Sequence, residues 1–195
     1  MRVVVTREDV AARVEALGHV AILCPLIRLE PLGDEPIDAS AYDWVVVTSA
    51  NGAHELGRRG VRAQRIAAIG PATADALREH GLAVDLVAET HTQEGLRDGL
   101  PPGRLLLAAA EGARRDVLAA DFLPLYRTVE LPQEVDADIA LLMSGSAARA
   151  LRTPMKVVAI GPQTADEARA AGHHVIAEAE THDVDGLLDA LRSLA

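Results

Sequence analysis

Residues 66–73, Ile-Ala-Ala-Ile-Gly-Pro-Ala-Thr, recur 91 residues further along the chain as residues 157–164, Val-Val-Ala-Ile-Gly-Pro-Gln-Thr. Each copy predicts a short apolar strand, a glycine turn and a proline that suits the first turn of a helix. The same offset aligns other segments, among them Glu89-Thr90-His91 with Glu180-Thr181-His182. Two copies in register indicate an internal duplication. The function must therefore depend on what two such units do together.

The chain has 195 residues, a length that suits one large domain or two small ones. Hydrophobic residues make up 49% and aromatic residues only 2%, so the cores must be built from Val, Leu, Ile and Ala. The 29 acidic and 19 basic residues give a formal net charge of −10. Because nucleic acids and anionic membranes bind positive surfaces, this balance argues against both as partners.

The cysteine count and the apolar runs bear on cellular location. Cys24 is the single cysteine and ends an apolar run, which predicts a buried thiol in a strand and excludes a disulfide framework. The sequence starts with a strand at residues 2–6, without a signal-peptide pattern. No apolar run approaches the roughly 20 residues that a membrane helix needs. We therefore expect a cytoplasmic protein.

Strands and helices are predicted to alternate along the chain. Strand 3–5, helix 8–17 and strand 20–23 form one β-α-β unit. A second unit is predicted from strand 104–107, a helix at 113–120 and an extended segment at 122–128. Further strands are predicted at 44–48, 66–69, 83–87, 139–143, 157–160 and 174–177. This alternation is typical of parallel sheets with helices on both faces, and the duplication divides it into two five-stranded, flavodoxin-like α/β domains.

Two proline-marked segments follow the β-α-β units. Pro25-Leu26-Ile27-Arg28 resembles Pro124-Leu125-Tyr126-Arg127, and prolines restrict such segments to edge or isolated strands. The residues alone leave open which β-α-β unit packs with which half of the chain. Two consecutive domains divided near residue 100 would be the simplest arrangement.

The turns after the strands are the candidate binding site. Ligands of open parallel sheets bind beyond the carboxyl ends of the strands, where glycine admits a ligand and helix N-termini attract anions. These turns predict a wide anion-binding cleft for a ligand with several carboxylates or phosphates. The alternative is that the same residues only cap helices. The predicted substrate-binding residues are Thr6, Arg7, Ser49, Asn51, Gly70, Thr73, Ser144, Ser146, Gly161 and Thr164.

Other kinds of site lack support in the sequence. There is no dinucleotide-binding glycine fingerprint, no phosphate loop ending in Gly-Lys-Ser/Thr and no Cys/His metal spacing, so we predict neither cofactor nor metal. His91 and His182 are repeat-related and could be paired ligands, but polar residues before a helix cap are more commonly solvated. Tyr126 is different, because its repeat counterpart is the apolar Ile27. Its phenol could donate a proton, or it could simply pack as a linker aromatic.

Taken together, these motifs resemble the uroporphyrinogen-III synthase family over essentially the whole chain. The resemblance rests on the order and spacing of six segments: Thr6-Arg7, Val47-Thr48-Ser49-Ala50-Asn51-Gly52, Ala68-Ile69-Gly70-Pro71-Ala72-Thr73, Thr92-Gln93-Glu94-Gly95-Leu96, Pro124-Leu125-Tyr126-Arg127-Thr128 and Ala159-Ile160-Gly161-Pro162-Gln163-Thr164. It implies an interleaved architecture. Residues 1–24 and 132–195 would form one discontinuous α/β domain and residues 33–123 the other. Residues 25–32 and 124–131 would be linker strands that pair as a two-stranded hinge.

The resemblance also implies a reaction. The substrate would be hydroxymethylbilane, a linear tetrapyrrole with eight carboxylates, cyclised to uroporphyrinogen III with inversion of the terminal ring and loss of water. Tyr126 would assist departure of the hydroxyl, and the predicted turns would hold carboxylates. A monomer without cofactor is expected. The alternatives are a non-catalytic module that binds a tetrapyrrole or another polyanion, and a degenerate paralogue kept as an interaction partner.

Overall fold

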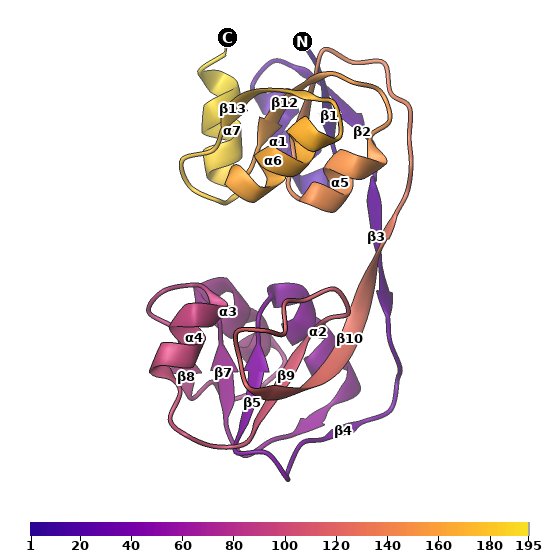
Figure 1. Cartoon of the computed structure of the whole chain (residues 1–195). Helices are drawn as coiled ribbons and strands as arrows, with labels where there is room; N and C mark the ends of the chain where they lie inside the picture. The colour runs from indigo at the N-terminus through magenta and orange to yellow at the C-terminus, as the bar shows by residue number, and fades with distance from the viewer. Residues whose placement is uncertain (195) are drawn as a thin grey trace. The chain divides into compact units, whose positions relative to one another are not determined.

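The computed structural model describes residues 1–194, so the end of the predicted discontinuous domain at residue 195 lies outside the described residues. The chain forms two compact units. Unit 1 comprises Met1–Arg28 and the chain from Val129 onward, and unit 2 comprises Leu29–Thr128. In Figure 1 unit 1 combines indigo with orange and yellow segments, whereas unit 2 is purple to pink.

Unit 1 contains a five-stranded sheet of the order β13-β12-β11-β1-β2, in which every pair is parallel. Counted along the chain this is the order 2-1-3-4-5, which flavodoxin also has. The central strands are fully buried runs of Val, Ile, Leu and Ala, as expected for a sheet covered on both faces. The strands are β1 (Arg2–Val5), β2 (Val20–Leu23), β11 (Ile139–Leu142), β12 (Lys156–Ala159) and β13 (His174–Glu178).

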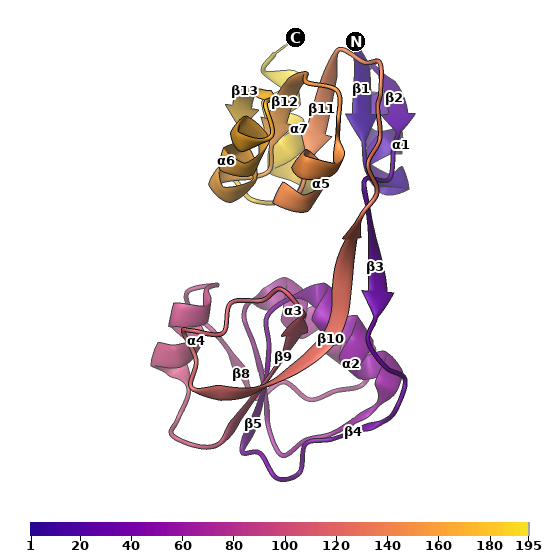
Figure 2. The ribbon, with the colours of Figure 1, turned by 45° about the vertical axis from the view of Figure 1, so that its right-hand side comes forward.

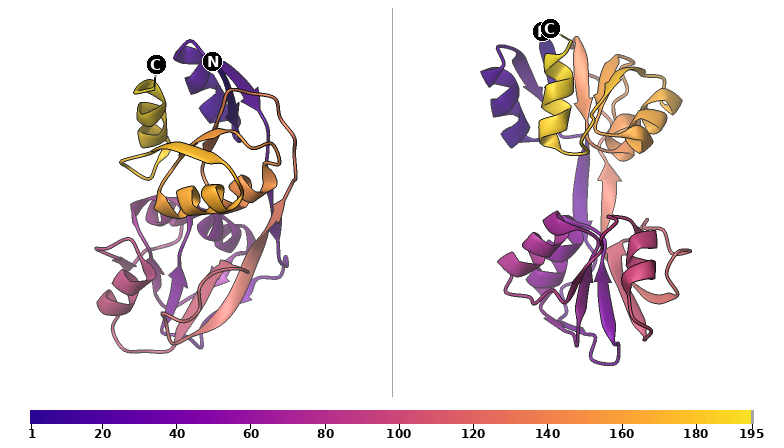
Figure 3. Two further views of the ribbon diagram at one scale, coloured as in Figure 1. Left: turned by 45° about the horizontal axis from the view of Figure 1, so that its top comes forward. Right: turned by 90° about the vertical axis from the view of Figure 1, so that its left-hand side faces the viewer.

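Helices cover both faces of this sheet. Helices α1 (Glu8–Ala16) and α7 (Val184–Arg192) pack with Val3 on one face, while α5 (Gly145–Ala150) and α6 (Pro162–Ala170) pack with Val4 on the other. Successive residues of a strand point to opposite faces, which explains this division. Figure 3 shows the helices on either side of the strands. The predicted parallel α/β fold is thus confirmed.

Unit 2 contains a six-stranded sheet of the order β3-β10-β9-β5-β7-β8 and a two-stranded sheet of β4 and β6. The predicted five strands are wrong for this sheet, because β3 adds a sixth strand beside β10. The two-residue strands β4 and β6 carry too little pattern to be predicted. The strands are β3 (Ile27–Pro31), β4 (Ile37–Asp38), β5 (Trp44–Val47), β6 (Val61–Arg62), β7 (Ile66–Ala68), β8 (Leu86–Val87), β9 (Leu105–Ala110) and β10 (Ala120–Glu130).

The helices of unit 2 are α2 (Ala50–Arg59), α3 (Pro71–Glu79) and α4 (Gln93–Gly99). The predicted helix at 113–120 is wrong. Residues 111–119 form a loop between the parallel strands β9 and β10, which is too short for a helical crossover of a dozen or more residues. The loop places Leu118, 4% exposed, in the apolar cluster of that face, where a helix would otherwise pack.

Strand β10 has 11 residues and lies between β9 and β3. Figure 2 shows β3 and β10 running in opposite directions. The amide of Leu32 donates to the carbonyl of Leu125 at 2.8 Å, and the amide of Leu131 donates to that of Leu26 at 2.9 Å. Both proline-marked segments are therefore extended, as predicted. No helix within residues 1–194 has the length and hydropathy to span a membrane.

Candidate functional site

The predicted turns of unit 1 lie side by side along one edge of its sheet. Strands β12, β11 and β1 are consecutive neighbours, and they lead at their carboxyl ends into Gly161, Ser144 and Thr6. Neighbouring strands lie about 4.8 Å apart, so these three turns form one continuous surface. The sheet changes winding direction between β1 and β11, which is where ligands of such sheets bind.

Ser144 is the N-cap of α5. Its hydroxyl accepts from the amide of Ala147 at 3.2 Å and lies 3.1 Å from the Ser146 hydroxyl. The two hydroxyls form a half-buried polar pair at the edge of the sheet. Helix-capping and ligand-binding interpretations are compatible here, because each hydroxyl retains further hydrogen-bonding capacity.

Thr6 and Arg7 follow β1. Thr6 is half-buried, and Arg7 is exposed at the start of α1. The Arg7 guanidinium binds Asp9 with two hydrogen bonds of 2.9 and 2.6 Å, and this contact lowers the pKa of the Asp9 carboxyl. The Arg7 guanidinium is therefore bound to a carboxylate in the first turn of its own helix, α1. Its role in binding substrate stays a prediction.

The turn at Gly161 borders a cavity of about 300 Å³ lined by Ile160, Gly161, Pro162, Gln163, Thr164 and His182. Helix α6 begins here with a proline and has no side-chain cap, so the first amides of the helix have no side chain bound to them. The Thr164 side chain is only 6% exposed although it is polar. This turn combines a cavity, free helix-start amides and a hydroxyl.

Unit 2 presents the corresponding turns. Ser49 follows β5 and caps α2 by accepting from the amide of Gly52 at 3.0 Å, and Asn51 is exposed in the first turn of that helix. Gly70 follows the neighbouring strand β7 and starts α3, again without a side-chain cap. Thr73 is 4% exposed, like its counterpart in unit 1. The structure thus brings these four residues to one edge of the second sheet.

Tyr126 lies at the same edge as Ser49. Its hydroxyl is 3.1 Å from the Ser49 hydroxyl, and its side chain, 6% exposed, packs into the core of unit 2. The register of β10 against β9 shifts between Pro124 and Tyr126, because proline has no amide hydrogen for the ladder. The Glu111 amide donates to the Tyr126 carbonyl at 2.8 Å and fixes this irregular segment. A buried phenol with one hydroxyl partner is suited to donating a proton.

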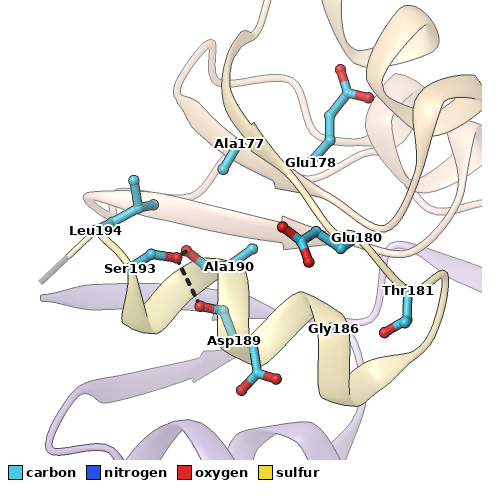
Figure 4. A pocket seen from close by; sticks show the side chains of 9 residues that line it. All are labelled: Ala177, Glu178, Glu180, Thr181, Gly186, Asp189, Ala190, Ser193 and Leu194. Carbon is cyan, nitrogen blue, oxygen red and sulfur yellow. Dashed lines mark hydrogen bonds between the residues drawn. The ribbon is translucent and has the colours of Figure 1, made fainter.

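A larger cavity, of about 460 Å³, lies between β13 and α7 (Figure 4). Its lining includes the carboxylates of Glu178, Glu180 and Asp189, which would repel a polyanion. Among the residues described, no three His, Cys, Asp or Glu side chains are arranged to hold a metal ion. This cavity is therefore not the anion site that the turns indicate.

The structure gives the repeat-related His91 and His182 a contact that the sequence does not show. Each imidazole lies against the glycine that starts the helix in its own unit, Gly70 or Gly161. The repeat register already aligned both pairs, so the signal was present. The sequence favours solvated histidines before the helix caps, because the contact between each histidine and its glycine is not visible in the sequence.

The fold and these turns define a class of parallel α/β protein in which, in both units, a glycine turn after a strand leads into a helix start without a side-chain cap. Residues 8–189 match the protein family described as uroporphyrinogen-III synthase HemD. A protein from Archaeoglobus fulgidus, provisionally named uroporphyrinogen-III synthase, is 29% identical over 206 residues, with 90% of this chain and 89% of that protein aligned. The chain belongs to the uroporphyrinogen-III synthase family.

Solved structures agree on the fold. A mutant uroporphyrinogen III synthase from the extremely thermophilic bacterium Thermus thermophilus superposes with a TM-score of 0.63 at 20% identity, covering 99% of this chain and 98% of the other. The uroporphyrinogen-III synthetase from Helicobacter pylori 26695 gives 0.68 at 14% identity, covering 100% and 99%. The predicted family and its enzyme class are confirmed, and a non-catalytic module is not favoured.

Proposed function

We propose that the protein converts hydroxymethylbilane to uroporphyrinogen III, with inversion of the terminal pyrrole ring and loss of water. The observation that carries the chemistry is the buried Tyr126 hydroxyl, 3.1 Å from the Ser49 hydroxyl at an edge lined with helix-start turns. The same edge offers a proton donor and anion-binding groups, which are the two things this reaction requires.

The first step is departure of the substrate hydroxyl. The bond between the terminal methylene carbon and oxygen breaks, Tyr126 donates its proton to the oxygen, and water leaves. The product is a cationic azafulvene. The Ser49 hydroxyl can donate to the phenolate that forms, which lowers the cost of the transfer. This role of Tyr126 is part of the proposal.

Ring inversion follows from where the azafulvene is attacked. The already substituted carbon of the terminal pyrrole forms a bond to the azafulvene carbon and gives a spiro intermediate. The bond from that ring carbon to its original bridge carbon then breaks and leaves a second cationic azafulvene on the neighbouring pyrrole. The ring turns, and the closing bond to that azafulvene is formed by the ring's unsubstituted carbon. Loss of the proton from this carbon restores the aromatic pyrrole and can reprotonate Tyr126. Holding the flexible chain in this geometry is the main catalytic contribution.

The acidic net charge of −10 is compatible with a substrate that carries eight carboxylates. Backbone amides and the positive ends of helices attract anions locally, whatever the net charge of the chain. The turns of both units supply such groups. The proposed binding residues remain those predicted from the sequence: Thr6, Arg7, Ser49, Asn51, Gly70, Thr73, Ser144, Ser146, Gly161 and Thr164.

The domain division is proposed along with the function. Residues 1–24 and 132–195 would form one domain, residues 33–123 the second, and residues 25–32 and 124–131 a two-stranded hinge. The pairing of β1 with β11 and the neighbouring positions of β3 and β10 support this division. A monomeric cytoplasmic enzyme without cofactor and without a nucleic acid partner remains a prediction.

Product analysis tests the proposal. The protein is incubated with hydroxymethylbilane generated enzymatically, and the oxidised porphyrins are separated by isomer. Uroporphyrin of the type III isomer is expected, because the uncatalysed closure gives type I. Type I alone would contradict the proposed function.

A further inference from the structure

His91 and His182 hold equivalent positions in the two units. A Cβ atom at Gly161 would lie 3.0 Å from Cδ2 and 3.2 Å from Nε2 of His182, and one at Gly70 would lie 3.1 Å from Cγ of His91. Each imidazole therefore lies directly against the glycine that begins helix α6 or α3. A Cβ at either position would crowd the ring, which would have to shift by a few tenths of an ångström.

The loops that carry the two histidines are held in the same way. The amide of Thr92 donates to the carbonyl of Thr90 at 2.7 Å, and in unit 1 Asp183 donates to Thr181 at 2.9 Å. One turn later, a Cβ at Gly95 would lie 2.1 Å from the carbonyl oxygen of Thr90, so the loop packs tightly on its helix. These contacts hold the backbone of each loop beside its helix, with the exposed imidazole against the glycine.

The helix starts beside the imidazoles have unused hydrogen-bonding groups. Neither α3 nor α6 has a side-chain cap, and the Thr73 and Thr164 side chains are 96% and 94% buried. No hydrogen bond joins either hydroxyl to another of the residues 1–194. Thr164 and His182 line the same cavity of about 300 Å³. Neither hydroxyl oxygen is among the fully enclosed unpaired polar atoms of residues 1–194, so both are accessible to a ligand that can bond to them.

We propose that His182 and His91 bind carboxylates of the substrate, one in each unit. A carboxylate in the cavity of unit 1 would accept from the amides at the start of α6, from the Thr164 hydroxyl and from the imidazole. An imidazole N–H can donate to a carboxylate oxygen, as the helix-start amides can. The neighbouring Asp183 carboxylate is already engaged by the Gly186 amide and the Thr181 hydroxyl. This inference rests on the proposed function.

Kinetics of ring-preserving variants test it. His182→Phe and His91→Phe keep a ring against the glycine but remove the ring N–H donors. Each should raise KM about threefold and the double variant about tenfold, with kcat within about twofold, since the loss of one net hydrogen bond costs about a factor of two to ten. His182→Lys and His91→Lys supply an N–H donor in place of the imidazole and should retain the KM of the natural protein. His174→Phe, at the amino end of β13, is the matched control and should change nothing.

A binding measurement separates this proposal from the proposed function. Uroporphyrin III, an octacarboxylate that does not react, should bind the double Phe variant about tenfold more weakly than the natural protein. Unfolding midpoints identify variants that do not fold, and His→Leu replacements, which also lack a donor, then carry the same expectation. If the double Phe variant keeps both its KM and its uroporphyrin affinity within twofold of the natural protein, the histidine role is wrong. Lys variants with a KM as high as that of the Phe variants would also overturn it. If the natural protein binds uroporphyrin through the histidines but forms only isomer I, the histidine role stands and the proposed function fails.

Discussion

Tyr126 and Ser49 are 77 residues apart in the chain, yet their hydroxyls are 3.1 Å apart. Each residue was identifiable from sequence. Tyr126 stands where the repeat has Ile27, and Ser49 follows an apolar strand. The contact between the two hydroxyls is not predictable from the sequence. It depends on the pairing of β10 and β5 with the shared neighbour β9 and on the register shift between Pro124 and Tyr126. The contacts of His91 with Gly70 and of His182 with Gly161 are also not predictable from the sequence, because they depend on how separate loops pack.

Tyr126→Phe should lower kcat for hydroxymethylbilane consumption about a hundredfold, the usual contribution of a positioned general acid. Removal of one buried hydroxyl leaves the ring packing intact, so the variant should fold. Tyr42→Phe is the matched control, because Tyr42 is the other tyrosine and binds Asp121 near the amino ends of the strands. Consumption rates under single-turnover conditions measure the effect. Equal rates for the natural protein and Tyr126→Phe would exclude the tyrosine as the proton donor.

Asp121 gives the clearest pH dependence of stability. Its hydrogen bond from Arg104, and then that from Tyr42, lower the pKa of the Asp121 carboxyl below its ordinary value of 3.8. A lowered pKa contributes stability that is present above the ordinary pKa and is lost as pH falls through the folded-state value. When the pH is lowered from 7 into the acid range, the free energy of unfolding of Asp121→Asn should therefore fall by less than that of the natural protein. Denaturant midpoints at both pH values measure this, with Asp116→Asn as the control, and identical acid losses in natural protein and Asp121→Asn would refute the assignment.

At the scale of elements, periodicity predicted most strands and helices, because buried parallel strands are continuous apolar runs. The predicted helix at 113–120 failed because nine residues do not suffice for a helical crossover. Strands β4 and β6 have two residues each, which is below what a pattern can reveal. Gly95 and Gly186 are also related by the 91-residue offset of the repeat. The structure gives the reason for both glycines, since each helix start approaches the carbonyl of the preceding loop.

Gly95→Ala and Gly186→Ala should each destabilise the protein by about 1–3 kcal/mol, the usual cost of forcing an atom into a packed site. The added Cβ would lie 2.1 Å from the Thr90 carbonyl oxygen or 2.3 Å from that of Thr181, and neither backbone atom can move cheaply. Gly99→Ala is the matched control in the same helix as Gly95, with no atom within 4 Å of the new Cβ. It should be neutral or stabilising by up to about 1 kcal/mol. Denaturant unfolding distinguishes these cases, and a Gly95→Ala variant as stable as Gly99→Ala would contradict the packing argument.

At the scale of the whole molecule, the two sheets share the same spatial order of five strands, but the chain passes through these strands in a different sequence in each unit. Strands β10-β9-β5-β7-β8 of unit 2 correspond to β2-β1-β11-β12-β13 of unit 1. In unit 1 the pair β1 and β2 precedes the other three strands in the chain, whereas in unit 2 the corresponding pair, β9 and β10, follows them. Gly70 and Gly161 therefore hold equivalent places in the two sheets, after β7 and after β12, although the strand pair comes after one and before the other in the chain. The residues alone left the assignment of units open, because strand pairing is not encoded locally.

Limited proteolysis tests the proposed domain division. Cleavage in residues 25–32 and 124–131 should release a stable fragment of about residues 33–123, identified by mass spectrometry. The remaining pieces, residues 1–24 and 132–195, should stay associated because β1 pairs with both β2 and β11. A stable fragment from residue 1 to about residue 100 would show that the domains are consecutive instead.

The central claim is that this chain controls how hydroxymethylbilane closes. The most direct test is the isomer ratio of uroporphyrin formed from enzymatically generated hydroxymethylbilane, with heat-denatured protein as the control. We predict predominantly type III with the folded protein and type I with the denatured protein. Type I in both reactions would contradict the account.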